Sequence, residues 1–148
     1  MTRRLEILYP IILACLAAGL WWKFKPVFPP DEKEFLAAGL SIGAILTGFI
    51  TTAKAILVAL PSDSIMGRLR ASGYIDDLIL YLAHALYSCF FFSIYCLAGF
   101  FLLEANKQVL TKYYGVVWIF LAVFSAAAFY RVSNFLFRII RFNPNGLP

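Results

Sequence analysis

The sequence predicts an all-α integral membrane protein with four transmembrane helices and with cytoplasmic extensions of the second, third and fourth helices. Composition is the first observation: 62% of the 148 residues are hydrophobic and 14% are charged, and the mean hydropathy is +0.81. Soluble domains carry about 25% charged residues. The second observation is four apolar stretches, at about residues 5–22, 35–60, 74–103 and 113–130. Each provides the ~18–20 residues that a helix needs to cross ~30 Å of hydrocarbon.

The connectors between these stretches are short, so we expect no soluble catalytic domain between the spans. We expect a single four-helix membrane domain over residues 1–148. A cleaved signal peptide is the alternative for the first stretch, because Arg3 and Arg4 precede an apolar run. Trp21 and Trp22 are typical of a membrane interface rather than of a small-residue cleavage site, so we expect the first span to be kept.

The positive charges predict the orientation of the helices. Every arginine falls on one side of the predicted membrane, whereas the lysines of the other side are largely balanced by acidic residues. The arginine side holds Arg3, Arg4, Arg68, Arg70, Arg131, Arg138 and Arg141; the other side holds Lys23, Lys25, Lys33, Lys107 and Lys112. By the positive-inside rule both termini are cytoplasmic, in a bacterial inner (plasma) membrane. Topology and anionic lipid account for the net charge of +5, so we expect no direct nucleic-acid binding.

Small residues cover two faces of the second span. One face holds Gly39 and Gly43 in GxxxG spacing. The other face is a seam of small residues at three- and four-residue intervals: Ala37, Ser41, Ala44, Gly48, Thr52, Ala55 and Ala59. Such faces let helix backbones approach closely, so the candidate packing residues are Gly39, Gly43, Ala44 and Gly48. Either one face packs within the subunit and the other between subunits of a homo-oligomer, or both serve the protein's own helices.

Two predicted cytoplasmic segments are candidates for binding a soluble partner or the lipid surface. Residues 61–73 have the pattern of a short amphipathic helix, and residues 131–142 continue the fourth span with basic residues along one face. The candidate docking residues are Ile65, Met66, Arg68, Leu69, Arg70, Arg131, Arg138 and Arg141. The charges fit anchoring on anionic lipid or docking of an acidic soluble protein.

A polar stripe follows one face of the third span. It consists of Asp77, Tyr81, His84, Ser88, Tyr95 and Gly99, which we expect to point inward because polar groups in lipid need partners. The stripe is either a proton or ion pathway or a set of hydrogen bonds between helices. Lys54, inside the second span, lies at about the same predicted depth as Asp77. It either snorkels to the headgroups or forms an ion pair with Asp77.

The sequence does not predict an enzyme, a cofactor or a metal site. It has a single histidine, and it has neither a metal-ligand spacing nor a Gly-rich phosphate loop nor a nucleophile elbow. Cys15, Cys89 and Cys96 all lie in predicted spans, where they act as small apolar side chains. Asp76 and Asp77 point about 100° apart on a helix, which does not suit an acid/base pair.

Four segments, residues 48–52, 56–60, 69–74 and 78–81, resemble small bacterial four-span proteins that look like membrane partners encoded in anti-phage defence loci, such as the membrane subunit of the Kiwa system. The resemblance implies an oligomeric inner-membrane component that works with a soluble cytoplasmic partner and responds to infection at the envelope. It implies no catalytic residues.

Three functions remain open at this point. The first is a non-enzymatic sensor or scaffold subunit that docks a soluble effector through the two cytoplasmic segments. The second is a pore-forming or depolarising effector, in which the stripe from Asp77 to Tyr95 lines a multimeric channel. The third is a small transporter, for which the sequence offers neither broken helices nor paired half-repeats.

Overall fold

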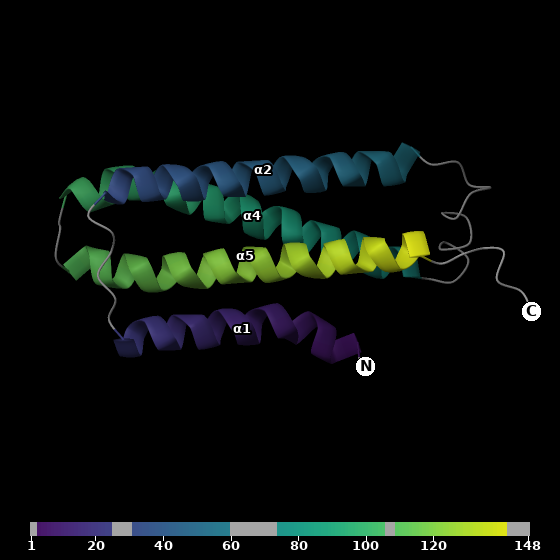
Figure 1. Ribbon diagram of the computed structural model, residues 1–148, viewed down its shortest axis with the longest axis horizontal. Helices are drawn as coiled ribbons and strands as arrows, with labels where there is room; N and C mark the ends of the chain where they lie inside the picture. The colour runs from purple at the N-terminus through teal and green to yellow at the C-terminus, as the bar shows by residue number, and fades with distance from the viewer. Residues whose placement is uncertain (1–2, 25–30, 60–73, 106–108, 142–148) are drawn as a thin grey trace, which may run out of the picture.

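Four long helices make up the part of the chain that the computed structural model describes, residues 3–24, 31–59, 74–105 and 109–141 (Figure 1). Side chains are described for residues 8–24, 31–59, 78–102 and 113–137. The helices are α1 (Arg3–Phe24), α2 (Glu32–Ala59), α4 (Tyr74–Ala105) and α5 (Val109–Arg141). The predicted all-α class is confirmed.

Three of the helices contain segments that are long and apolar enough to cross a membrane: Glu32–Ala59, Leu78–Leu102 and Tyr113–Phe137. The apolar part of α1, Leu8–Phe24, is shorter. Together these helices make the chain a small multi-pass membrane protein by length and hydropathy. The first predicted span therefore differs from the other three, although the whole of α1 has 22 residues and is about 33 Å long at ~1.5 Å per residue.

The helix boundaries follow from the local sequence. At the start of α2, the backbone N–H of Phe35 donates to the carbonyl of Asp31 at 3.1 Å, and Glu32 and Glu34 stand in the first turn, where carboxylates suit the helix dipole. Helix α5 continues to Arg141, as expected for the segment after the fourth span. Helix α1 bends near its N-terminal end (Figure 1), in the part of the helix that contains Pro10, which lacks a backbone N–H.

The helices form an open row in the order α2, α4, α5, α1 (Figure 1). Helix α4 packs against both α2 and α5, whereas α2 and α5 touch each other little. Helix α1 packs against α5, on the side away from α2. The structure therefore places α1 and α2 at the two edges of the row rather than in a closed bundle.

Two clusters of buried side chains hold the row together. The first joins α2, α4 and α5 and contains Ile50, Leu78, Tyr81, Leu82, Ala85, Cys89, Ala128 and Val132. The second contains Leu36, Phe92, Cys96, Tyr114 and Trp118, with Trp21 of α1 packed against it. Helix α4 contributes to both clusters, which explains its central position.

Large apolar side chains cover the outside of the row. On α4 alone, Phe90, Phe91, Ile94 and Leu97 are exposed. In water such a surface would be strongly unfavourable, whereas in a bilayer it faces lipid tails. The surface and the core together fit a membrane environment.

Candidate functional site

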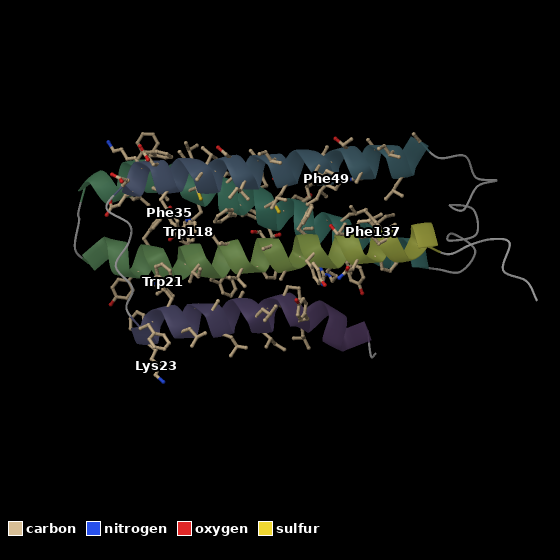
Figure 2. The ribbon with its side chains drawn as sticks, in the orientation of Figure 1. Trp21, Lys23, Phe35, Phe49, Trp118 and Phe137 are labelled. Carbon is tan, nitrogen blue, oxygen red and sulfur yellow. The ribbon has the colours of Figure 1, made fainter. Side chains whose placement is uncertain are left out.

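One end of the row is rich in aromatic side chains, and we call it the aromatic end. The rings of Trp22 on α1 and Tyr113 on α5 lie 5.9 Å apart between centroids. The ring of Phe35, at the start of α2, lies 4.6 Å from that of Trp118 on α5 between centroids (Figure 2). Tyrosine and tryptophan gather where hydrocarbon meets the headgroups. The aromatic end therefore marks one membrane interface.

Helices α4 and α5 are joined at this end by a pair of tyrosines. The hydroxyl of Tyr114 donates to the carbonyl of Tyr95 at 2.7 Å, and the hydroxyl of Tyr95 donates to the carbonyl of Tyr114 at 3.3 Å. The rings stack at 4.5 Å with an interplanar angle of 9°. The ring of Tyr114 lies against Gly99, where a β-carbon would come within 2.8 Å of Cζ. Glycine at position 99 is thus what allows the close approach.

Trp118 ties three helices together beside this pair. Its indole N–H donates to the sulfur of Cys96 at 3.3 Å, and its ring packs against Phe35 and Phe92. A buried indole needs a partner for its one donor, and the thiol of Cys96 supplies it. Cys96 is therefore a hydrogen-bond acceptor as well as the small apolar side chain that the sequence predicted.

The GxxxG face of α2 packs inside the subunit. A β-carbon on Gly43 would collide with the hydroxyl of Ser93 and lie 3.3 Å from the backbone carbonyl oxygen of Cys89. A β-carbon on Gly39 would lie 3.0 Å from the sulfur of Cys96. Both glycines therefore bring the backbone of α2 against α4.

The second small face of α2, which we call the α2 seam, lies on the outside. All seven of its residues are exposed: Ala37, Ser41, Ala44, Gly48, Thr52, Ala55 and Ala59. A β-carbon on Gly48 would have no atom within 4 Å. The hydroxyls of Ser41 and Thr52 donate to the carbonyls of Ala37 and Gly48, at 2.8 and 2.9 Å. The α2 seam is thus a smooth face without a helix partner in the part of the chain that the structure describes.

The polar stripe of α4 turns mainly towards α5. Tyr81 and Ser88 are buried, and the Ser88 hydroxyl donates to the carbonyl of Ala85 at 3.0 Å. His84 is exposed, which differs from the expectation that the whole stripe points inward. The reason is angular, since Tyr81 and His84 lie at opposite margins of the stripe, about 60° apart at ~100° per residue. Helix α5 covers only the margin with Tyr81.

Arg131 lies between α4 and α5 rather than on a free surface. Its guanidinium carbon lies 4.4 Å from the centroid of the Tyr81 ring, and the side chain is half-buried. Phe135 of α5 also packs against Tyr81, and their ring centroids lie 6.0 Å apart. The sequence predicts Arg131 as a docking residue of the C-terminal segment, and the structure adds a cation–π contact that gives it a role inside the helix row.

Lys54 is exposed on α2. The side chain of Asp77 lies outside the described residues, so the choice between snorkelling and an ion pair with Asp77 stays open. The side chains of the other candidate docking residues also lie outside the described residues: Ile65, Met66, Arg68, Leu69, Arg70, Arg138 and Arg141.

The contacts between helices also align the heights of the four helices. Gly43 faces Cys89 and Ser93, so Lys54, about eleven residues further along α2, lies level with about Leu80 of α4. Arg131 lies on Tyr81, so Lys54 and Arg131 share one height, which we call the basic end. Gly115 of α5 faces Trp21 of α1. Arg4 comes about 17 residues before Trp21 in α1, so it lies at nearly the same height as Arg131.

The aromatic and basic ends are one bilayer apart. From Tyr113 to Val132, α5 advances by about 19 residues, or ~28 Å at ~1.5 Å per residue. The hydrocarbon core of a bilayer is ~30 Å thick. Trp22 with Tyr113 and Lys54 with Arg131 therefore mark the two interfaces, and α2, α4 and α5 continue beyond the basic one.

The described residues offer no metal centre: within them, no group of three or more His, Cys, Asp or Glu side chains is close enough to hold an ion. Sequence reasoning missed the contacts of Tyr114, Trp118 and Gly115. The only signal was the run Tyr113-Tyr114-Gly115, which places a small residue beside aromatic ones. Compared with known proteins, the chain matches no family model, no curated protein and no solved structure.

Proposed function

We propose that this protein is a non-enzymatic, oligomeric subunit of the bacterial inner membrane that docks a soluble cytoplasmic partner, as a sensor or scaffold in anti-phage defence. The observation that carries the proposal is the exposed α2 seam at the edge of an open helix row. The proposal has two parts, assembly of copies through this seam and docking of the partner at the basic end.

The α2 seam differs from the other lipid-facing surfaces of the protein. Exposed positions on α4 carry Phe90, Phe91, Ile94 and Leu97, which suit contact with lipid tails. Helices in a bilayer gain little hydrophobic energy from meeting each other, and association depends on close packing of small residues. A seven-residue small face with internally bonded hydroxyls supports a close helix contact with a second copy.

The partner surface is proposed at the basic end, where the arginine-rich segments lie by sequence. Helix α5 continues to Arg141, beyond the height of Arg131, and therefore carries Arg138 and Arg141 past the membrane interface. Together with Arg68 and Arg70 these side chains suit an acidic protein surface. The resemblance to membrane proteins of defence loci supports a soluble cytoplasmic partner of this kind.

A larger side chain on the α2 seam tests the assembly part of the proposal. Gly48→Leu places a bulky side chain on the α2 seam, and Gly19→Leu is the matched control, because a β-carbon on Gly19 of α1 also has no atom within 4 Å. Single-molecule photobleaching in nanodiscs, or chemical crosslinking in membranes, reports the number of copies. We expect Gly48→Leu to give monomers and Gly19→Leu to keep the oligomer. An oligomer that survives Gly48→Leu unchanged would reject the seam as the interface.

The docking part is tested by co-purification with the product of a neighbouring defence gene. The triple variant Arg68→Glu, Arg70→Glu, Arg138→Glu should lose the partner while remaining in the membrane. The pore alternative predicts instead that overexpression collapses the membrane potential and that His84→Leu or Ser88→Leu prevents it. Because Ser88 is buried and bonded within α4, we expect no such collapse.

A further inference from the structure

We propose that the surface beside Tyr81, where α4 and α5 meet, binds the phosphate of an anionic phospholipid, with Arg131 and His84 as the phosphate-binding residues. The proposal goes beyond assembly and partner docking and depends on neither. It rests on the side-chain arrangement around Tyr81, on the height of this arrangement in the bilayer, and on the apolar surface that continues from it.

Two basic residues from different helices lie near Tyr81, Arg131 against its ring and His84 one turn along α4. The guanidinium of Arg131 lies 4.4 Å from the ring centroid. His84 follows Tyr81 by one turn of α4, and residues at this spacing have β-carbons about 5–6 Å apart. A guanidinium can bind two phosphate oxygens at once, and an imidazole N–H can donate to a third.

The exposed imidazole of His84 has no hydrogen-bond partner among the residues that the structure describes. His84 faces outward within the span Leu78–Leu102. A polar group that faces hydrocarbon without a partner is unfavourable by several kcal/mol. A lipid phosphate would satisfy this donor at the surface of the bilayer.

The height of the site suits a phosphate group. Arg131 lies at the basic end, ~27 Å along α5 from Tyr113 at ~1.5 Å per residue. This is the boundary of a ~30 Å hydrocarbon core, and phosphates lie just beyond it. His84 lies about one turn deeper in the bilayer than Arg131. The lipid phosphate would therefore be drawn towards the protein, to a place between Arg131 and His84.

An apolar surface for the acyl chain continues from the same faces of the two helices. Phe91 follows His84 by two turns of α4 and is exposed. On α5, Phe124 lies two turns from Arg131 and Phe120 about three turns, and their half-buried rings stack at 6.1 Å. A lipid whose phosphate is held by Arg131 can therefore lay its chain along aromatic rings.

Charge complementarity selects an anionic headgroup. The guanidinium of Arg131 faces the phosphate, and a zwitterionic choline headgroup would add a second positive charge beside it.

The test is native mass spectrometry of the purified full-length protein titrated with phosphatidylglycerol or phosphatidylcholine in detergent. We expect the wild-type protein to prefer phosphatidylglycerol, and His84→Leu and Arg131→Gln each to weaken its binding about tenfold, which is typical of the loss of one hydrogen bond to a charged group. Lys54→Gln is the matched control, because Lys54 lies at the same height but on α2, which packs against a different face of α4.

Three outcomes would overturn the proposal. An equal loss of binding in Lys54→Gln would assign the effect to the general charge of the basic end. Displacement of the lipid by inorganic phosphate would assign the site to the free ion. Unchanged binding in His84→Leu would remove the site altogether, and this variant decides the question if Arg131→Gln fails to fold. Gly48→Leu should bind the lipid normally, so failure of the proposed assembly leaves this test intact.

Discussion

Tyr95 and Tyr114 each donate their hydroxyl to the backbone carbonyl of the other, at 3.3 and 2.7 Å, with their rings stacked at 4.5 Å. The pair joins α4 to α5 at the aromatic end and gives both phenolic donors an acceptor in a region poor in water. Carbonyl oxygens in a helix have a second lone pair that can accept such a bond. The arrangement therefore stabilises the helix contact without leaving a polar atom towards lipid.

Removing one hydroxyl of this pair should weaken the α4–α5 contact modestly. We expect Tyr114→Phe to lower the free energy of unfolding by about 1 kcal/mol, because it removes one intramolecular hydrogen bond and keeps the ring. Tyr114→Ala also removes the stacked ring and should cost about 3–5 kcal/mol. Unfolding in mixed micelles, followed by circular dichroism, measures both. Tyr87→Phe, on the exposed face of α4, is the control and should have no effect.

The contact between α2 and α4 should be sensitive to a single methyl group. In Gly43→Ala the new β-carbon meets the hydroxyl of Ser93 and the backbone of Cys89, so we expect a loss of about 1–3 kcal/mol from overpacking. Gly48→Ala on the same helix has open space and should show no loss. The same unfolding assay compares them.

A double variant separates this clash from a general effect of alanine in the helix. Ser93→Ala removes the hydroxyl that the new methyl group meets, so Gly43→Ala with Ser93→Ala should recover part of the stability. If the two losses simply add, the packing of Gly43 against Ser93 is not the cause.

The sequence predicted the helices well because length and hydropathy depend on the chain alone. The starts of α2, α4 and α5 and the ends of α2 and α4 fall within a few residues of the predicted spans, and the continuation of α5 to Arg141 matches the predicted extension over residues 131–142. The two small faces of α2 were also visible as spacing. What spacing could not assign was their partners, since Gly39 and Ala44 are both small residues in an apolar helix.

Pairings between helices explain the remaining differences. A helical wheel places Tyr81, His84 and Ser88 on one side of α4, but the angle at which α5 covers that side decides that Tyr81 is buried and His84 exposed. From the sequence alone, Arg131 is predicted to be a surface charge in a segment with other arginines. Only its contact with the ring of Tyr81 shows that it lies between two helices. Such contacts depend on residues far apart in the chain.

Helix α1 should depend on Gly115 for its place in the row. A β-carbon on Gly115 would lie 2.9 Å from the indole nitrogen of Trp21, so Gly115→Val should push α1 away from α5. Hydrogen exchange followed by mass spectrometry in detergent should show faster exchange in peptides of α1 and unchanged exchange in α2. Val117→Ala, an exposed position on α5, serves as the control. Equal exchange in α1 of both variants would contradict a role for this contact.

The two interfaces predict which positions meet water. We expect single cysteines, introduced after replacing Cys15, Cys89 and Cys96, to react with a membrane-impermeant maleimide at positions 23 and 58 but not at position 45. Lys23 and Val58 lie at or beyond the aromatic and basic ends, whereas Ile45 lies between them on the lipid-facing surface of α2. Position 45 is also the control for leaky membranes.

The same variants determine the orientation of the helices. With both termini in the cytoplasm, the reagent added to intact spheroplasts should label position 23 alone, and inverted vesicles should expose position 58. The opposite pattern would reverse the orientation and move the arginine-rich segments away from any cytoplasmic partner. Labelling of position 45 from either side would contradict its place between the two interfaces, on the lipid-facing surface of α2.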